Sequence, residues 1–248
     1  MSLDLDAVFL DAGGVLVQPS WTRVATALAA QGVAVDAAAL ARAEAQVKRE
    51  LDEAHVIRAT SDASRAKRYF EVVVARARGD DDTAPSSAAI LAALDDVRLY
   101  HARENLWEDV RDDAWASLPR LRALGLRLVV VSNANGRLRA AFDRIGLTPH
   151  LDDIIDSTEV GYEKPDPGIF RVALARAGTE PARVLHVGDV YHIDVVGAWR
   201  AGIRGVLLDV ADLYADHDCP RVPSLAALAD LIAAGDARPF GAVPAVSP

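Results

Sequence analysis

Acidic side chains that follow short apolar segments are the residues best suited to chemistry in this sequence. Asp11 follows the apolar segment 5–10, and Asp189 follows the segment 183–187 and one glycine. A carboxylate at the end of a strand can attack an electrophilic phosphorus or carbon atom and form a covalent ester. Neighbouring carboxylates such as Asp189 and Asp194 offer the hard oxygen ligands that suit Mg²⁺. This pattern predicts an aspartate nucleophile, Asp11, near an acidic metal site.

Two further positions carry groups that stabilise negative charge. Ser132 ends the apolar segment 126–131 with a hydroxyl group, and Lys164 precedes Pro165 with a fixed positive charge. A phosphoryl group in transfer needs such partners for its own negative charge. Simpler roles are open for each residue: Ser132 as the N-cap of the next helix, and Lys164 as a surface lysine.

Two of the acidic positions also allow simpler interpretations. Asp11 precedes a Gly-Gly pair and would suit the start of a turn. Asp194 would suit the N-cap of a helix that begins at Val195.

The elements that position these residues alternate along the chain. Short apolar segments at 5–10, 126–131, 153–156, 183–187 and 205–208 predict strands, and periodic segments at 115–124, 137–145, 167–177 and 194–201 predict helices. Each of these helices is followed by a glycine, the usual C-terminal stop. Alternation of this kind predicts an α/β fold with a doubly wound parallel sheet, whose ligands bind at the carboxyl ends of the strands. Asp11, Ser132 and Asp189 all lie at that edge.

Residues 20–113 follow a different pattern. Ala, Leu, Val and Arg dominate there, with apolar positions at helical spacing and no strand-like segment. We therefore predict an inserted all-helical cap at 20–113, a core made of 1–19 and 114–235, and a flexible C-terminal tail at 236–248, which is rich in Pro, Ala and Gly.

Composition limits the class of partner. The 248 residues carry a formal net charge of −9 and a sequence pI of about 5.1, which disfavours nucleic acid and anionic membranes. Cys219 is the single cysteine, so no internal disulfide is possible. The N-terminal residues do not resemble a secretory signal, and no apolar segment is long enough to span a bilayer. We expect a soluble, cytoplasmic protein, and the sequence is silent on oligomeric state.

Four segments, in this order and spacing, resemble the haloacid dehalogenase-like (HAD) superfamily of hydrolases. The resemblance covers nearly the whole chain and implies a Rossmann-like HAD core. The helical insertion after the first segment is similar to the C1 cap of subfamily I. The four segments are VFLDAGGVL at 8–16, VVVSN at 129–133, EKPDP at 163–167 and HVGD at 186–189.

The resemblance implies a role for each site residue. Asp11 would be the nucleophile, and Lys164 would contact both the nucleophile and the phosphate. Asp194 would support the site by orienting water or Lys164. The phosphate would be held by Ser132, Asn133 and Lys164, and Mg²⁺ by Asp11, the backbone carbonyl of Gly13 and Asp189.

One position departs from the pattern of HAD phosphatases. These enzymes carry a second aspartate two residues after the nucleophile, which protonates the leaving group and then activates water. Gly13 occupies that position, and Val15 stands where the pattern has Thr. His55 and His192 are two residues that could replace the missing acid/base. We expect a Mg²⁺-dependent phosphatase of a small phosphorylated metabolite that lacks the usual second aspartate.

Three alternatives stay open. A 2-haloacid dehalogenase needs no acid, and Arg42 has the spacing of its halide-contacting arginine, but those enzymes resemble Ser-Ser-Asn where this chain has Gly188-Asp189. A catalytically weak regulatory or binding protein with the HAD fold would also lack the acid/base. A phosphonate hydrolase would need a cap lysine, for which Lys48 and Lys67 are candidates.

Overall fold

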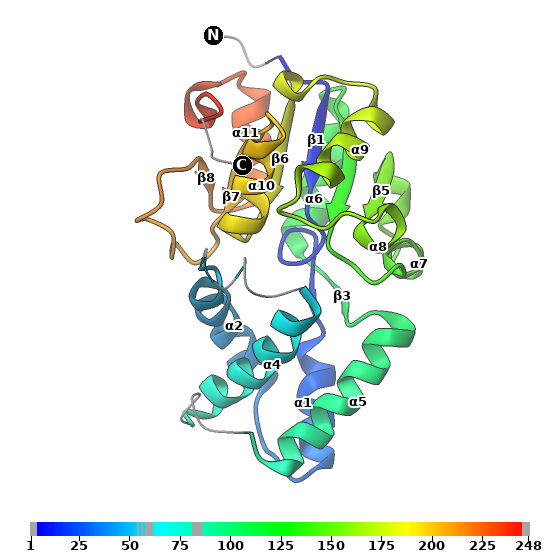
Figure 1. The fold of residues 1–248 in the computed structure, drawn as a ribbon, viewed down its shortest axis with the longest axis vertical. Coiled ribbons are helices and arrows are strands. Elements are labelled where there is room, and N and C mark those ends of the chain that lie inside the picture. The colour runs from blue at the N-terminus through cyan, green and yellow to red at the C-terminus, as the bar shows by residue number, and fades with distance from the viewer. Residues whose placement is uncertain (1–3, 54, 56, 58–61, 81–85, 245–248) are drawn as a thin grey trace. The chain divides into compact units, whose positions relative to one another are not determined.

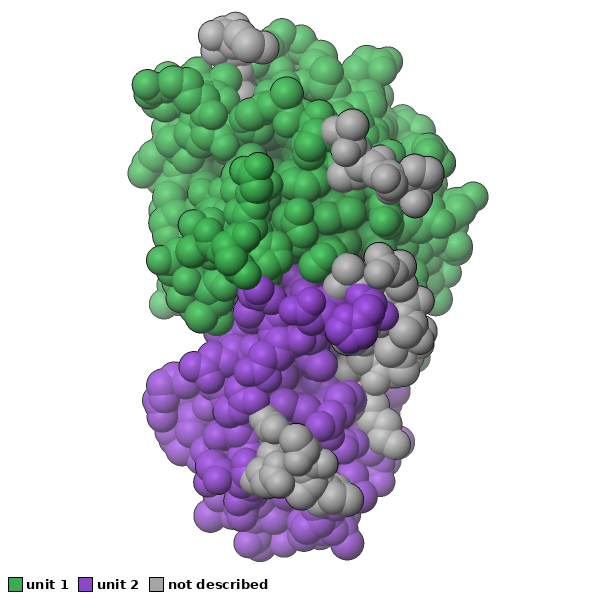
Figure 2. Space-filling model, turned by 60° about the vertical axis from the view of Figure 1, so that its left-hand side comes forward, with its two compact units in different colours: residues 1–18, 108–248 green, residues 19–107 purple. Residues whose placement is uncertain are grey.

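The structure is a computed structural model that describes residues 4–53, 55, 57, 62–80 and 86–244, with the backbone alone for 62–67. The chain divides into two compact units: residues 1–18 with 108–248, and residues 19–107 (Figure 2). We call the first the core unit and the second the cap unit. We predicted the second boundary after residue 113, whereas the division falls at 107/108. The difference arises because Trp107–Val110 forms a short strand, β3, and helix α6 begins directly afterwards at Asp112.

The core unit contains a six-stranded parallel sheet in the order β5-β4-β1-β6-β7-β8 (Figure 1). This confirms the predicted α/β class and the doubly wound parallel sheet. The strands are β1 (Ala7–Leu10), β4 (Arg127–Ser132), β5 (Asp153–Asp156), β6 (Val184–Gly188), β7 (Arg204–Leu208) and β8 (Arg221–Val222). Their side chains are almost wholly buried, as expected for a sheet covered on both faces.

Helices connect the strands in the predicted alternation. They are α6 (Asp112–Ala123), α7 (Leu138–Arg144), α8 (Ser157–Val160), α9 (Pro167–Ala177), α10 (Val196–Arg200) and α11 (Leu225–Ala233). A π-helical turn, Tyr191–Val195, precedes α10, and the 3-10 turns are Thr148–His150, Pro181–Arg183 and Arg238–Phe240. The sequence analysis missed α8, α11 and β8.

One face of the sheet packs against α9 and α10. Phe9 of β1, Val131 of β4 and Val184 of β6 share a buried cluster with Ile169 and Phe170 of α9. Helix α9 begins and ends at residues that favour helix termini. The Asp166 side chain accepts a hydrogen bond from Gly168 N at 2.6 Å, Pro167 opens the helix, and Gly178 ends it in the left-handed conformation.

The cap unit contains the helices α1 (Trp21–Ala30), α2 (Ala37–Leu51), α4 (Asp62–Arg78) and α5 (Ala88–Glu104). Apolar residues at helical spacing, such as Val24 and Leu28 of α1, build its own buried cluster together with Leu40, Val73 and Leu94. Strand β2 (Val17–Pro19) pairs with β3 where the chain passes between the units, so the predicted absence of strands from 20–113 was wrong.

The predicted C-terminal tail is partly packed. Phe240 is buried, and Val243 packs against the cluster around Val195 and Trp199, so the described residues 236–244 contribute to the core unit. Residues 245–248 lie outside the described part of the chain. Within the described residues, no helix has the length and apolarity that a membrane span requires.

Candidate active site

Three of the predicted site residues stand at the carboxyl edge of the sheet. Asp11 follows β1 directly, Ser132 is the last residue of β4, and Asp189 follows β6. The parallel pairing of β1 with both β4 and β6 brings these three strand ends together. The backbone N–H of Asp11 donates to Val187 O at 2.8 Å, which fixes the start of the loop against β6.

The loop after Asp11 folds back on itself. Ala12 O accepts hydrogen bonds from both Leu16 N and Val17 N at 2.9 Å, and Gly14 N donates to Val17 O at 2.7 Å. Gly14 requires glycine because its φ is 76°, whereas Gly13 is not among the described glycines with positive φ. The backbone conformation of Gly13 therefore does not itself require glycine.

Lys164 is the central cation of the site. Its ammonium Nζ lies 2.8 Å from Asp11 Oδ1 and 2.6 Å from Asp194 Oδ1, and its side chain is only 1% exposed. The alternative of a surface lysine is therefore wrong. Asn133 clamps the lysine backbone from both sides: Asn133 Nδ2 donates to Lys164 O at 2.9 Å, and Lys164 N donates to Asn133 Oδ1 at 2.6 Å.

This clamp gives Asn133 a role beyond the expected one. Its side-chain amide positions Lys164, and the predicted contact of Asn133 with phosphate stays a prediction. The Ser132 hydroxyl interacts with the Asp11 carboxylate and opposes the rise of its pKa. Neither residue caps the next helix, since α7 begins at Leu138 with Arg137 as its N-cap residue. Ser132 stays a candidate phosphate ligand.

Asp194 lies against three nitrogen atoms. Its Oδ1 accepts from Lys164 Nζ at 2.6 Å and lies 3.1 Å from His186 Nε2, while its Oδ2 accepts from Val190 N at 3.1 Å. The carboxylate lies directly over Gly188, where an added Cβ would come within 2.0 Å of Asp194 Cγ. Asp194 therefore orients Lys164 from within the turn and does not cap α10, whose N-cap residue is Val195.

Burial and charge act in opposite directions on these groups. Burial raises the pKa of Asp11, although the charge of Lys164 opposes this shift. For Asp194, burial alone would raise the pKa, but Lys164 and His186 outweigh it and hold the pKa well below its ordinary value. Burial would lower the pKa of Lys164, yet the two carboxylates outweigh it and raise that pKa. The ion pair between Lys164 and Asp194 therefore stays charged at neutral pH.

The residues present fit a divalent cation. One carboxylate oxygen each of Asp11, Asp189 and Asp194 lie within 4.8 Å of one another. The three carboxylates gather negative charge at this edge of the sheet, and Lys164 pairs with two of them, Asp11 and Asp194. Asp11 Oδ1 is also buried. Among the described residues it forms an ion pair with Lys164 Nζ and accepts no further hydrogen bond. Hard oxygen donors with negative charge suit Mg²⁺.

The turn that carries Lys164 also packs against helix α10. The Lys164–Pro165 peptide is cis, and Pro165 lies against Gly197 of α10. A Cβ at Gly197 would lie 3.1 Å from both Pro165 Cα and Phe170 Cε2. Glycine at this position lets α10 approach the turn that carries Lys164.

Two site residues were missed by the sequence analysis. His186 is buried in β6 beside Asp194, and Asp156 holds the loop after Ser132 by accepting from Gly136 N at 2.9 Å and Thr158 N at 3.0 Å. The signal for His186 was present: a polar residue inside an otherwise apolar strand needs a buried partner. For Asp156 the contact with Thr158 N is the local N-cap of α8, whereas the contact with Gly136 N joins residues 20 apart, which no local pattern indicates.

His55 and His192 were the two residues that could replace the missing acid/base. The His55 side chain is exposed, and the His192 ring lies against Tyr191, with a centroid separation of 4.9 Å. In the cap unit, Arg42 is exposed and Lys48 forms an ion pair with Glu44 at 3.2 Å. The side chain of Lys67 lies outside the described residues.

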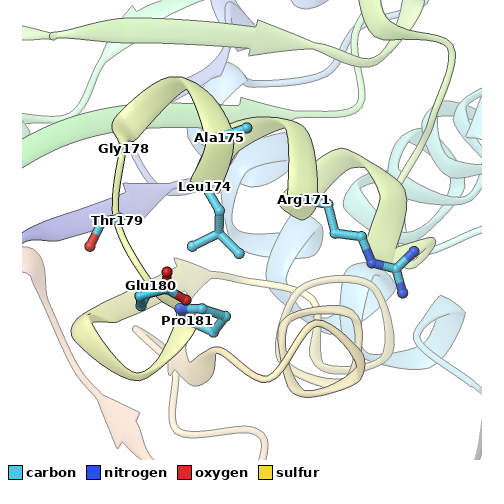
Figure 3. A pocket seen from close by; sticks show the side chains of 7 residues that line it. All are labelled: Arg171, Leu174, Ala175, Gly178, Thr179, Glu180 and Pro181. Atoms are coloured by element: carbon cyan, nitrogen blue, oxygen red, sulfur yellow. The ribbon is translucent and has the colours of Figure 1, made fainter.

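A shallow pocket of about 360 Å³ lies elsewhere on the core unit (Figure 3). Its lining includes Leu174 of α9, Gly178 and Pro181, and none of the predicted site residues. Gly178 and Pro181 lead into the amino end of β6, whereas Asp189 follows its carboxyl end. The pocket is therefore separate from the carboxyl-edge site.

The chain resembles known proteins along most of its length. Residues 5–202 match the model of the haloacid dehalogenase-like hydrolase family. A mouse protein, haloacid dehalogenase-like hydrolase domain-containing protein 3, is 35% identical over 155 residues, which cover 61% of each chain. A glyceraldehyde 3-phosphate phosphatase of Methanothermobacter thermautotrophicus is 29% identical over 217 residues, covering 86% of this chain and 90% of that protein.

Solved structures agree with this assignment at the level of fold. A HAD hydrolase of Bacillus subtilis bound to magnesium matches with a TM-score of 0.65 at 15% identity, covering 92% of this chain and 99% of that one. Dehalogenases are among the other matching structures. The matched region of the first relatives spans only 40–61% of their length, so their activities are not transferred by similarity alone. The family match and the fold together show that this chain belongs to the haloacid dehalogenase-like hydrolase family.

Proposed function

We propose that the chain is a Mg²⁺-dependent phosphatase that acts on a small phosphorylated metabolite through an aspartyl-phosphate at Asp11. The observation that carries this proposal is the cluster of three carboxylates, Asp11, Asp189 and Asp194, two of which pair with the buried ammonium of Lys164. An anion can enter such a site only if a cation offsets its carboxylates. The similarity to an archaeal sugar-phosphate phosphatase and to a magnesium-bound fold relative supports the same assignment.

The residues present account for two chemical steps. A carboxylate oxygen of Asp11 attacks phosphorus, the new O–P bond forms, and the bond to the leaving oxygen breaks. Water then attacks the aspartyl-phosphate, which releases inorganic phosphate and restores the carboxylate. Lys164, 2.8 Å from Asp11 Oδ1, lies where its charge would offset that of the transferred phosphoryl group, and the Ser132 hydroxyl would donate to it.

Mg²⁺ would be held by Asp11, Asp189 and the backbone carbonyl of Gly13, and when bound it supplies positive charge to the phosphate oxygens. Asp194 then acts through Lys164, because Lys164 Nζ, His186 Nε2 and Val190 N already surround its two oxygens. Since Gly13 carries no carboxyl group, the leaving group departs without the protonation that the usual second aspartate provides.

The experiment is a screen of sugar phosphates, phosphoserine, aryl phosphates and acyl phosphates, with Mg²⁺ and with excess chelator. We expect phosphate release with Mg²⁺ and none with chelator, and Asp189→Asn should resemble the chelated protein. Lys48→Met in the cap unit is a matched charge control that should retain activity. Halide release from 2-chloropropionate, measured in parallel, should be absent. Full turnover in chelator, or halide release, would contradict the proposal and favour a dehalogenase.

A further inference from the structure

His186 is a buried titratable side chain that the mechanism above does not use. It lies in the middle of β6, paired in register with Phe9 of β1, and is fully buried. Its Nε2 lies 3.1 Å from Asp194 Oδ1, the same oxygen that accepts from Lys164 Nζ. We propose that His186 is a positioning residue, whose Nε2–H fixes the Asp194 carboxylate that holds Lys164 against Asp11. This inference rests on the proposed phosphatase function.

The surroundings of the ring indicate which nitrogen carries the proton. His186 Nδ1 is buried and has no hydrogen-bond partner among the described residues, and the ring meets Phe170 edge-on at a centroid separation of 4.8 Å. A proton on Nδ1 would leave a buried donor unpaired and turn a bare Nε2 lone pair toward a carboxylate, and both arrangements are unfavourable. The neutral ring with its proton on Nε2 satisfies Asp194 and leaves only a weak acceptor near Phe170.

A hydrogen bond from His186 Nε2 would hold the Asp194 carboxylate in one orientation. His186 and Lys164 take both acceptor directions of Oδ1, and Val190 N binds Oδ2. The His186 contribution is uncharged, so it directs the carboxylate without competing with Lys164 for its charge. Without His186, Oδ1 would have Lys164 as its only remaining partner, and the carboxylate would be free to draw the ammonium away from Asp11 and the phosphate.

The competing explanation is that His186 only fills space between Phe9 and Phe170. Two substitutions separate the explanations. His186→Met keeps an unbranched side chain of similar bulk but has no N–H donor. His186→Gln carries an amide nitrogen the same number of bonds from Cβ as Nε2, so it restores the donor to Asp194. Leu185→Ala, at the neighbouring buried position of β6, is the control for packing damage alone.

Steady-state kinetics with the best phosphate ester, together with inhibition by inorganic phosphate, measure the effect. We expect His186→Met to lower kcat/KM about 10- to 100-fold, the range found when a residue that orients site ligands is lost. It should also weaken phosphate inhibition. His186→Gln should recover most of both losses, and Leu185→Ala should lower the melting temperature with little change in kcat/KM. Equal losses in the Met and Gln variants, in proportion to their loss of stability, would overturn the positioning role.

A second measurement keeps this inference separate from the proposed function. In a ¹⁵N spectrum of histidine-labelled wild-type protein at neutral pH, His186 should show a slowly exchanging proton on Nε2 and a bare Nδ1. If no phosphate ester is cleaved but this tautomer is found, the phosphatase proposal fails while the contact between His186 and Asp194 stands. A proton on Nδ1, or a ring proton in rapid exchange with water, would overturn the inference whatever the activity.

Discussion

Lys164 Nζ lies 2.6 Å from Asp194 Oδ1 and 2.8 Å from Asp11 Oδ1, so a single ammonium neutralises part of two carboxylates. The side chains of Lys164 and Asp194 are each 1% exposed, whereas that of Asp11 is 13% exposed. The lysine is thus anchored on the buried side by Asp194 and directed toward the one carboxylate that solvent reaches. This arrangement suits a nucleophile that must contact a substrate while its supporting charge stays fixed.

Removing the ammonium should affect both stability and activity. Lys164→Met leaves two buried carboxylates without their counter-charge, and breaking a buried ion pair typically costs about 3–5 kcal/mol. We expect urea denaturation to show a loss of that order and phosphatase activity to disappear. Lys48→Met is the control, because Lys48 is partly exposed and Glu44 keeps its hydrogen bonds from Trp21 and Tyr69. A stable Lys164→Met protein with normal turnover would show that the ion pair is not needed.

Gly188 provides a test of the geometry with no change of charge. A Cβ at this position would lie 2.0 Å from Asp194 Cγ and 2.2 Å from its Cβ, so Gly188→Ala must displace the carboxylate. We expect kcat to fall about tenfold or more, since small displacements at a reacting centre are costly. Val184→Ala, at the other end of the same strand, should lower stability without this loss. Unchanged kinetics in Gly188→Ala would mean that the position of Asp194 does not govern turnover.

The sequence predicted the fold because local signals and burial agree in the core unit. Segments such as 153–156 have strand-like composition and are flanked by helices that end in glycine, and the structure confirms both. The strands β2 and β3 were missed because their three and four residues show no clear periodicity. Their pairing joins two segments that lie far apart in the sequence, and no local pattern predicts such a contact.

The site was predicted only in part for a related reason. Asp11, Lys164 and Asp194 come together because parallel strands place their following loops at one edge, and the parallel sheet follows from alternation. The contact between Asn133 and the Lys164 backbone depends on the detailed conformation of two loops that lie 31 residues apart. A residue type alone cannot distinguish an amide that binds phosphate from one that binds the backbone.

Acid should weaken the amino-terminal edge of the sheet. Arg183 forms a two-pronged ion pair with Asp6, with 2.6 Å from both Nε and Nη2, and Thr179 Oγ1 donates to the same carboxylate. The hydrogen bonds from Arg183 and Thr179 lower the pKa of Asp6 to about 2. A pKa that is lower in the folded state stabilises the protein above the unfolded value near 4, and this contribution is lost as the pH falls to about 2.

Asp6→Asn isolates this contribution. We expect the difference in unfolding free energy between wild type and variant to be small and constant above pH 5, and to shrink between pH 4 and pH 2, because the pair is exposed and screened by solvent. Urea denaturation at several pH values measures it. A difference that persists unchanged at pH 2 would show that the Asp6 carboxylate is not the titrating group.

The final prediction concerns Gly13, which stands where related phosphatases carry the acid/base. A positioned general acid contributes roughly 10²–10⁴ in rate, mainly for poor leaving groups such as alkoxides. Without it, aryl and acyl phosphates should be cleaved much faster than alkyl phosphate esters. The same absent group would activate the water that hydrolyses the aspartyl-phosphate, so a burst followed by a slow steady rate is expected.

Gly13→Asp tests both effects in one protein. The backbone of Gly13 does not have positive φ, so it does not itself require glycine, and the carbonyl stays available to Mg²⁺. Turnover of alkyl phosphates should rise and the burst should fade, while aryl phosphates, whose leaving groups need less help, should change little. Gly14→Asp is a contrasting control, because φ at Gly14 is 76° and the loop should distort. If the wild type already cleaves alkyl and aryl phosphates equally fast, another residue supplies the proton. The search for it would then begin with His192, three residues beyond Asp189 on the same edge of the sheet.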